Sequence, residues 1–151
     1  MKNLLFVLLS ISSLTIYSQN ENMYIKKHSR AHFSKKAIEF QNTVRGYYSL
    51  KPLRYSKTLS KQAQVWANHL EEIDQLNLSE DTLGETLYAL DKSEFVIPKN
   101  IYLDAAVGWL EAFEEPEYYQ TLCGECEQVG FGIAENELNI YVVAKYDKIY
   151  D

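Results

Sequence analysis

The end of the sequence carries the pattern that most restricts the fold. Residues 129–134 and 138–146 are rich in valine, isoleucine, tyrosine and other residues that favour strands. The residues between them, Glu135, Asn136 and Glu137, are polar and suit a turn. The two runs therefore predict an antiparallel hairpin. The second run contains the sequence IYVVAKY, which is largely apolar and predicts a strand buried on both faces.

Three segments before the hairpin have the spacing of amphipathic helices. Apolar residues recur at steps of four, three, four and three over residues 33–47. Ser56 is placed to cap a second helix whose apolar stripe covers residues 59–73. A third helix is expected over about residues 101–115, with Pro116 ending it. Helices followed by a hairpin indicate an α+β domain. The inward-facing residues of the third helix are expected to be Ala106, Trp109, Leu110 and Phe113.

The first residues have the three-part layout of a secretory signal peptide. Lys2 is followed by a mostly apolar run from Leu4 to Tyr17 and then by the small residue Ser18. That run is shorter than the roughly 20 residues that span a bilayer, although an N-terminal membrane anchor is the alternative. We therefore expect a secreted or periplasmic protein with no membrane span after signal cleavage. The expected parts are a signal peptide over 1–18, a polar leader over 19–32 and one domain over 33–151.

The charge of the chain argues against one class of partner. The formal net charge is −6, and acidic and basic residues are mixed along the sequence. A net acidic domain repels phosphate backbones, so we expect no nucleic-acid partner.

Four blocks of the sequence occur in the order found in one known family. Residues 42–70, NTVRGYYSLKPLRYSKTLSKQAQVWANHL, resemble the first block of the CAP superfamily, which includes cysteine-rich secretory, antigen 5 and pathogenesis-related-1 proteins and is also called the SCP domain. GETLY at 84–88, AAVGWLEAF at 105–113 and the run at 128–146 resemble the later blocks. The resemblance implies an α-β-α sandwich, with a small antiparallel sheet between helices and a cleft on one side.

In many family members, two histidines and two glutamates in the cleft can hold a divalent metal such as zinc. Of these four positions only Glu85 is retained here, and Tyr48, Ala112 and Glu117 occupy the others. Glu111 precedes Ala112, but one residue rotates a helical side chain by about 100°, so Glu111 replaces it only if the helix shifts register. We therefore expect no metal site of the family type and no cofactor. The histidines of the chain lie elsewhere, at His28, His32 and His69.

The residues that remain near the expected cleft are aromatic and acidic. Aromatic faces with hydroxyl tips suit a lipid, sugar or peptide ligand, and they equally suit ordinary packing. Glu85 has two interpretations: a carboxylate bonded to backbone amides or to Arg45, or a cleft carboxylate that contacts a ligand. The candidate ligand-binding residues are Tyr48, Glu85, Glu117, Tyr118 and Tyr119.

The two cysteines, Cys123 and Cys126, have the C-x-x-C spacing of many redox and metal sites. A redox cysteine needs a stabilised thiolate, which Glu125 and Glu127 disfavour. A zinc site would require two further ligands. In an exported protein the favoured interpretation is a local disulfide between Cys123 and Cys126. Two free thiols, or pairing with another chain, remain open.

The function predicted from these features is that of an exported, non-catalytic CAP-like binding or interaction protein with a degenerate cleft. Its ligand is unknown, whether a lipid, another small molecule or a protein. One alternative is a hydrolase that uses Glu85 as acid and base, although a single carboxylate is a poor catalytic set. Another alternative is a purely structural envelope protein.

Overall fold

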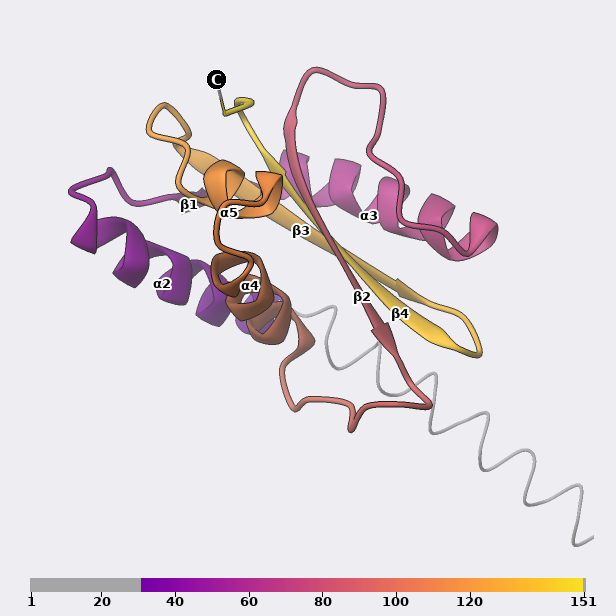
Figure 1. The fold of residues 1–151 in the computed structure, drawn as a ribbon. Coiled ribbons are helices and arrows are strands. Elements are labelled where there is room, and N and C mark those ends of the chain that lie inside the picture. The colour runs from indigo at the N-terminus through magenta and orange to yellow at the C-terminus, as the bar shows by residue number, and fades with distance from the viewer. Residues whose placement is uncertain (1–30, 151) are drawn as a thin grey trace, which may run out of the picture.

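The computed structural model describes residues 31–150 (Figure 1). The expected signal peptide and most of the polar leader, including His28, lie outside the described residues. Ser56 caps the second helix as expected, because its side chain accepts a hydrogen bond from the backbone N–H of Leu59. The elements in chain order are α2 (Ala31–Tyr47), β1 (Arg54–Tyr55), α3 (Lys57–Ile73), β2 (Gly84–Asp91), α4 (Ile101–Glu111), α5 (Pro116–Thr121), β3 (Gln128–Glu135) and β4 (Asn139–Tyr146).

The strands form one sheet in the order β1-β3-β4-β2. The hairpin of β3 and β4 is present, with Val129 opposite Tyr146, and β2 pairs with β4 antiparallel along its whole length. The three long strands form the small antiparallel sheet that the sequence predicts, and the two-residue strand β1 adds a parallel pair with β3, so the complete sheet is mixed. A parallel pair needs a long crossover, and here several elements lie between β1 and β3.

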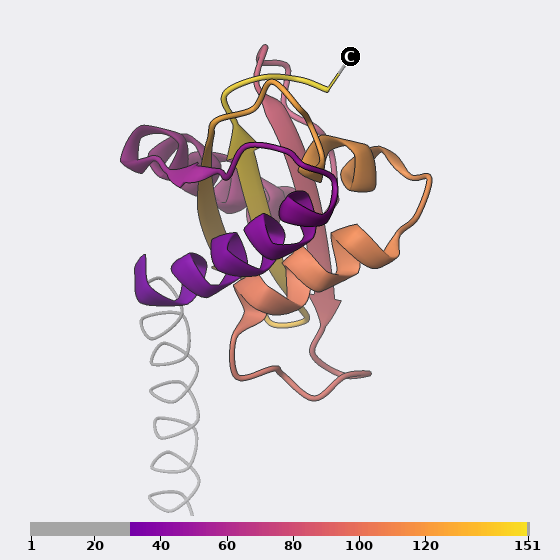
Figure 2. The same ribbon diagram turned by 90° about the vertical axis from the view of Figure 1, so that its left-hand side faces the viewer.

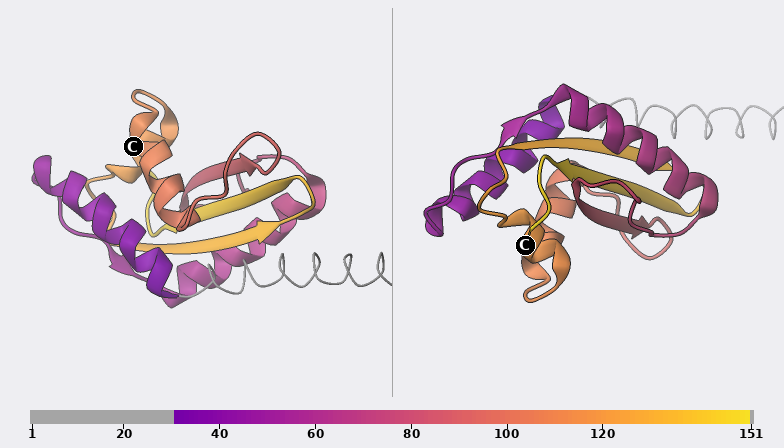
Figure 3. Two further views of the ribbon diagram at one scale, coloured as in Figure 1. Left: turned by 90° about the horizontal axis from the view of Figure 1, so that it is seen from below. Right: turned by 90° about the horizontal axis from the view of Figure 1, so that it is seen from above.

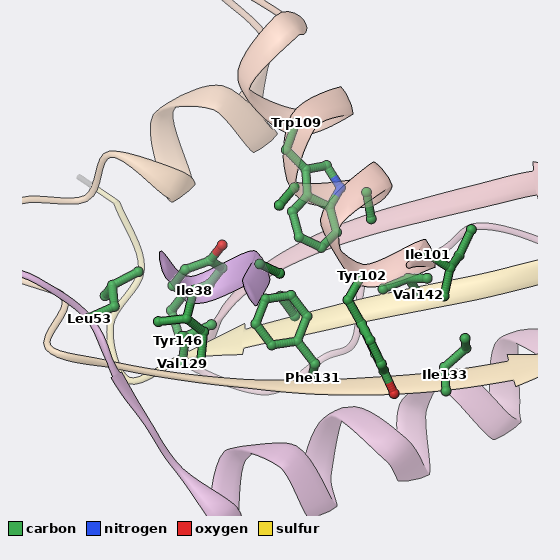
Figure 4. Packing of buried hydrophobic residues seen from close by; sticks show 14 of the residues in the cluster. Ile38, Leu53, Ile101, Tyr102, Trp109, Val129, Phe131, Ile133, Val142 and Tyr146 are labelled. Carbon is green, nitrogen blue, oxygen red and sulfur yellow. The ribbon is translucent and has the colours of Figure 1, made fainter. Parts of the chain in front are cut away.

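Helices cover both faces of the sheet, which gives three layers (Figures 2 and 3). Side chains of β4 alternate between two hydrophobic clusters: Val142 and Ala144 face α2 and α4, whereas Tyr141 and Val143 face α3. Every residue from Ile140 to Tyr146 is buried, as the apolar run predicts. On the side of α2 and α4, the rings of Trp109, Tyr102 and Phe131 pack between helix and sheet (Figure 4).

The backbone of α3 lies directly on β3, because the strand presents glycines to it. A Cβ atom on Gly132 would lie 2.3 Å from the backbone carbon of Ala63, and one on Gly130 would lie 2.1 Å from a backbone nitrogen of α3. Beyond the short pairing of β3 with β1, backbone groups on this edge of β3 form hydrogen bonds with side chains of α3. Gln64 donates to the carbonyl of Ile133 at 2.6 Å and accepts from its N–H at 3.1 Å. The edge therefore has no unpaired amide at Ile133.

Arg45 is a fully buried cation near the end of α2. Its guanidinium donates to the carbonyl oxygens of Lys51, Thr121, Cys123 and Cys126 at 2.9 to 3.2 Å. These acceptors belong to the approach to β1, the end of α5 and the loop before β3. The same loop is closed by a disulfide between Cys123 and Cys126. Arg45 thus connects the end of α2 with residues 121–126, which lie far away in the sequence.

The third helix ends earlier than the sequence predicts. It stops at Glu111, and Pro116 begins α5 instead of ending α4. Proline is favoured in the first turn of a helix, because its fixed φ fits and the N–H that it lacks would have no partner there. Ala106 and Trp109 are buried as expected, but Phe113 follows the helix and is 67% exposed.

We predict that Gly132→Ala destabilises the protein by about 3 kcal/mol, because the methyl group would collide with the backbone of α3. Gly46→Ala is the control, since nothing lies within 4 Å of a Cβ at that helical position. This control should raise stability by roughly 0.5 kcal/mol. Urea unfolding of the two variants measures both effects, and a similar cost for both would contradict the close packing.

Candidate functional site

Glu85 lies at the start of β2, directly opposite Lys145 of β4. Residues opposite each other in an antiparallel pair project from the same face of the sheet, so the two side chains meet. Oε2 of Glu85 is 2.6 Å from Nζ of Lys145, and their side chains are only 4% and 1% exposed. This is a buried ion pair.

The connection between α3 and β2 closes over this ion pair. Ser79 donates to Glu85 through its backbone N–H and its hydroxyl, both at 2.9 Å. Asp81 Oδ2 lies 2.5 Å from Nζ of Lys145, which also donates to the hydroxyl oxygen of Ser79. Burial acts to raise the pKa of Asp81, but the hydrogen bonds from Lys145 and from the N–H of Leu83 outweigh it, and that pKa lies below its ordinary value.

The contacts of Glu85 limit what it can do chemically. Its carboxylate is held by one ion pair with Lys145 and by two hydrogen bonds from Ser79, so both of its oxygens already have partners in the protein. Nζ of Lys145 donates to the hydroxyl oxygen of Ser79, and that hydroxyl donates in turn to Glu85. Arg45, which the sequence offers as a partner for Glu85, binds backbone carbonyls elsewhere.

A cavity of about 300 Å³ lies beside Glu85. Its walls come from the connection before β2, from α5 and from the segment after β4. The polar groups of Ser79, Asp81, Glu85 and Gln120 also line it. The apolar and aromatic part of the lining consists of Leu78, Leu83, Pro116, Tyr119, Ile149 and Tyr150.

A continuous row of five aromatic rings runs from the end of α2 to this cavity. The hydroxyl oxygens of Tyr48 and Tyr118 are 3.0 Å apart. The ring of Tyr118 contacts Phe113 and Tyr119, with centroids 5.1 and 5.5 Å apart. Tyr119 stacks on Tyr150 with centroids 5.4 Å apart. We call these five residues the aromatic row: Tyr48, Phe113, Tyr118, Tyr119 and Tyr150. The hydrogen bond to Tyr48, with a contribution from burial, raises the pKa of Tyr118.

The expected cleft residues are thus divided between two places. Glu85 and Tyr119 line the cavity, and Tyr48 and Tyr118 belong to the adjoining aromatic row. Glu117 lies in the first turn of α5 and does not line this cavity.

Sequence reasoning missed several residues of this region. Lys145 carries the one signal that could have been used, because a lysine inside the run IYVVAKY requires a buried partner. Phe113 was expected to face the core, and Tyr150 lies in a C-terminal segment that has no periodic pattern. Their places in the aromatic row follow from tertiary contacts alone.

Residues 38–146 match the family model "CAP: Cysteine-rich secretory protein family". The chain belongs to this family. No protein in the curated set matches the sequence. Among solved structures, this CAP protein is similar to NaASP2, crystallised with Zn2+, at 16% identity over 78% of this chain and 80% of that one, with a TM-score of 0.66.

Two further structures share the fold with this CAP protein. Venom allergen-like protein 4 of Schistosoma mansoni is 16% identical over 80% of this chain and 86% of that chain, with a TM-score of 0.55. An outer surface protein from Borrelia burgdorferi is 13% identical over 78% of this chain and 94% of that chain, with a TM-score of 0.56. At these identities the likeness concerns the fold.

The residues of this CAP protein at the family's metal positions do not fit a zinc ion. The hydroxyl of Tyr48 is bonded to Tyr118, and Glu85 is bonded to Lys145. Among residues 31–150, no group of three or more histidine, cysteine, aspartate or glutamate side chains is placed to hold a metal. His69 packs on Trp66 with ring centroids 4.7 Å apart. None of the helices described within 31–150 is long and apolar enough to cross a membrane.

We predict that Lys145→Met destabilises the protein by about 3 to 5 kcal/mol, because Glu85 would keep a buried charge without a partner. The double variant Lys145→Met, Glu85→Leu should recover a large part of this loss. Lys36→Met, at an exposed position of α2, is the control and should change stability by less than about 0.5 kcal/mol. A double-mutant cycle from urea unfolding measures the coupling, and additive effects would contradict the ion pair.

We predict that Tyr48→Phe lowers the pKa of Tyr118 towards its ordinary value, since the hydrogen bond between the two hydroxyls is the main cause of its elevation. An NMR titration of protein with ¹³C-labelled tyrosine rings measures this pKa. Tyr47→Phe, one residue away and 83% exposed, should leave it unchanged. An equal shift in both variants would rule out this hydrogen bond as the cause.

Proposed function

We propose that this CAP protein is an exported, non-catalytic binding protein whose ligand occupies the cavity beside Glu85. The observation that carries this proposal is the ion pair of Glu85 with Lys145, reinforced by Ser79. This ion pair involves Glu85, which is the one residue retained from the two histidines and two glutamates of the family's cleft. The adjoining walls are mostly apolar and aromatic, with a few polar groups, which is the usual lining of a ligand site.

Three observations support export. The N-terminal sequence has the layout of a signal peptide. The family is named for secretory proteins, and one protein of similar fold is an outer surface protein. The disulfide between Cys123 and Cys126 suits an oxidising compartment. We propose the periplasm or the outside of the cell as the site of action.

The size of the cavity narrows the class of ligand. About 300 Å³ lies at the small end of ligand sites, so it suits part of a lipid chain or a few side chains of a protein. The ligand proposed here is accordingly a lipid or a segment of a partner protein. Tyr119 and Tyr150 would contact it from one wall.

Native mass spectrometry of the mature protein, secreted by its own host and gently purified, tests this proposal. We predict a mass that corresponds to cleavage near Ser18, an intact disulfide and a retained ligand. Tyr119→Ala should lose the ligand, because it opens one wall of the cavity, whereas Tyr47→Ala should keep it. A ligand retained equally by both variants would place the binding site elsewhere. Turnover of a substrate that disappears in Glu85→Gln would favour a hydrolase instead.

A further inference from the structure

The connection between α4 and α5 is strongly acidic. The sequence EAFEEPE over residues 111–117 contains Glu111, Glu114, Glu115 and Glu117. The first three are exposed, and the fourth is half-buried. The ion pairs found within residues 31–150 include none of the four. This surface therefore carries four carboxylates that form no ion pair with any residue in the described part of the chain.

The same connection borders the aromatic row. Tyr118 is the nearly buried centre of the row, and the four residues around it are exposed: Phe113 by 67%, Tyr48 by 54%, Tyr150 by 45% and Tyr119 by 38%. Exposed aromatic side chains that gather in one place indicate an interaction surface. Their ring faces attract cations, and guanidinium groups stack on them especially well.

Several contacts hold this surface in one arrangement. Glu114 has a φ of 70°, a left-handed conformation that is uncommon for residues other than glycine and that often occurs at functional sites. Pro116 fixes the start of α5, and Arg45 binds the carbonyl of Thr121 at its end. The hydroxyls of Tyr48 and Tyr118 join the turn after α2 to α5. A surface that is ordered before binding loses less entropy when a partner docks.

We propose that the aromatic row and the four glutamates of residues 111–117 form a docking surface for a basic, arginine-bearing segment of a partner protein. This inference rests on the proposed binding function and identifies the partner as a protein. Guanidinium groups match both components, because they stack on aromatic rings and form paired hydrogen bonds with carboxylates. The phosphate of a lipid headgroup would instead be repelled by the four carboxylates.

Binding of short synthetic peptides to the full mature protein tests the surface. The probe is a fluorescent peptide of alternating arginine and glycine, and the matched peptide carries citrulline, which has the same shape without the charge. A third peptide carries lysine. Fluorescence anisotropy should show that the arginine peptide binds tightest, that lysine binds more weakly and that citrulline does not bind. Equal binding of arginine and citrulline would overturn the proposal.

Two variants with the same change in net charge separate local from overall electrostatics. Replacing Glu111, Glu114, Glu115 and Glu117 by glutamine should weaken binding of the arginine peptide by about tenfold or more. Replacing Glu71, Glu72, Glu94 and Glu137 by glutamine should leave it nearly unchanged. These residues lie on α3, on the connection before α4 and on the turn before β4. Equal weakening by both variants would show attraction by net charge alone and would overturn the docking surface.

A second pair of variants tests the aromatic row. Phe113→Ser should weaken binding of the arginine peptide by a few-fold, the size expected for one exposed cation–π contact. Phe95→Ser is the control, because that phenylalanine is 58% exposed on the connection before α4 and lies outside the row. Both side chains are exposed, so both variants should fold, as circular dichroism would verify. If the two variants bound the arginine peptide equally well, the aromatic row would not be part of the docking surface.

The outcomes distinguish this inference from the proposed function. A ligand held in the cavity of the purified protein, without binding of the arginine peptide, would support the binding function and overturn the docking surface. Peptide binding that Phe113→Ser and the glutamine variant weaken, with an empty cavity after purification, would support the docking surface and make the partner protein the ligand. Failure of both experiments would overturn both proposals.

Discussion

The buried guanidinium of Arg45 holds together the half of the molecule in which the candidate site lies. It joins α2 to the carbonyls of Lys51, Thr121, Cys123 and Cys126, which belong to three other segments. The disulfide closes only a very short loop, so it contributes little long-range order. Arg45 is therefore the group that fixes α5 and the loop after it against α2, and the meeting of tyrosine side chains between the two helices depends on that arrangement.

The second determinant of the site is the ion pair between Glu85 and Lys145. Glu85 stands at a position where many family members have a cleft carboxylate, and here that carboxylate is bound by Lys145. Hydrogen bonds from Ser79 to Glu85 and an ion pair of Asp81 with Lys145 link the pair to the connection before β2. Removing either partner of such a buried pair would leave the other charge without compensation, so the pair fixes the start of β2 against the end of β4. The chain thus keeps the CAP fold with both oxygens of Glu85 engaged by protein groups.

Much of the fold could be predicted because its signals are local. Periodicity placed the three longer helices and the hairpin, and Ser56 marked the start of α3. The short elements could not be predicted in this way. The two residues of β1 have no pattern of their own, and α5 is a six-residue helix whose first residue, Pro116, resembles a stop signal. Because α4 ends at Glu111, before this proline, Phe113 lies outside the helix and is exposed.

The sequence by itself determined most of the helical faces, although Tyr47 and Phe113 at their ends are exposed, together with the hairpin, the family and the absence of imidazoles from the cleft positions. Each of these depends on residue types at fixed local spacing. Only the tertiary structure decided which partners the polar and aromatic groups have. Glu85 meets Lys145 through the register of β2 on β4, and Tyr48, which directly follows α2, meets Tyr118 of α5 where Arg45 binds the carbonyl at the end of α5. Strand register and loop paths come from the summed packing of the whole chain, so no local pattern encodes those contacts.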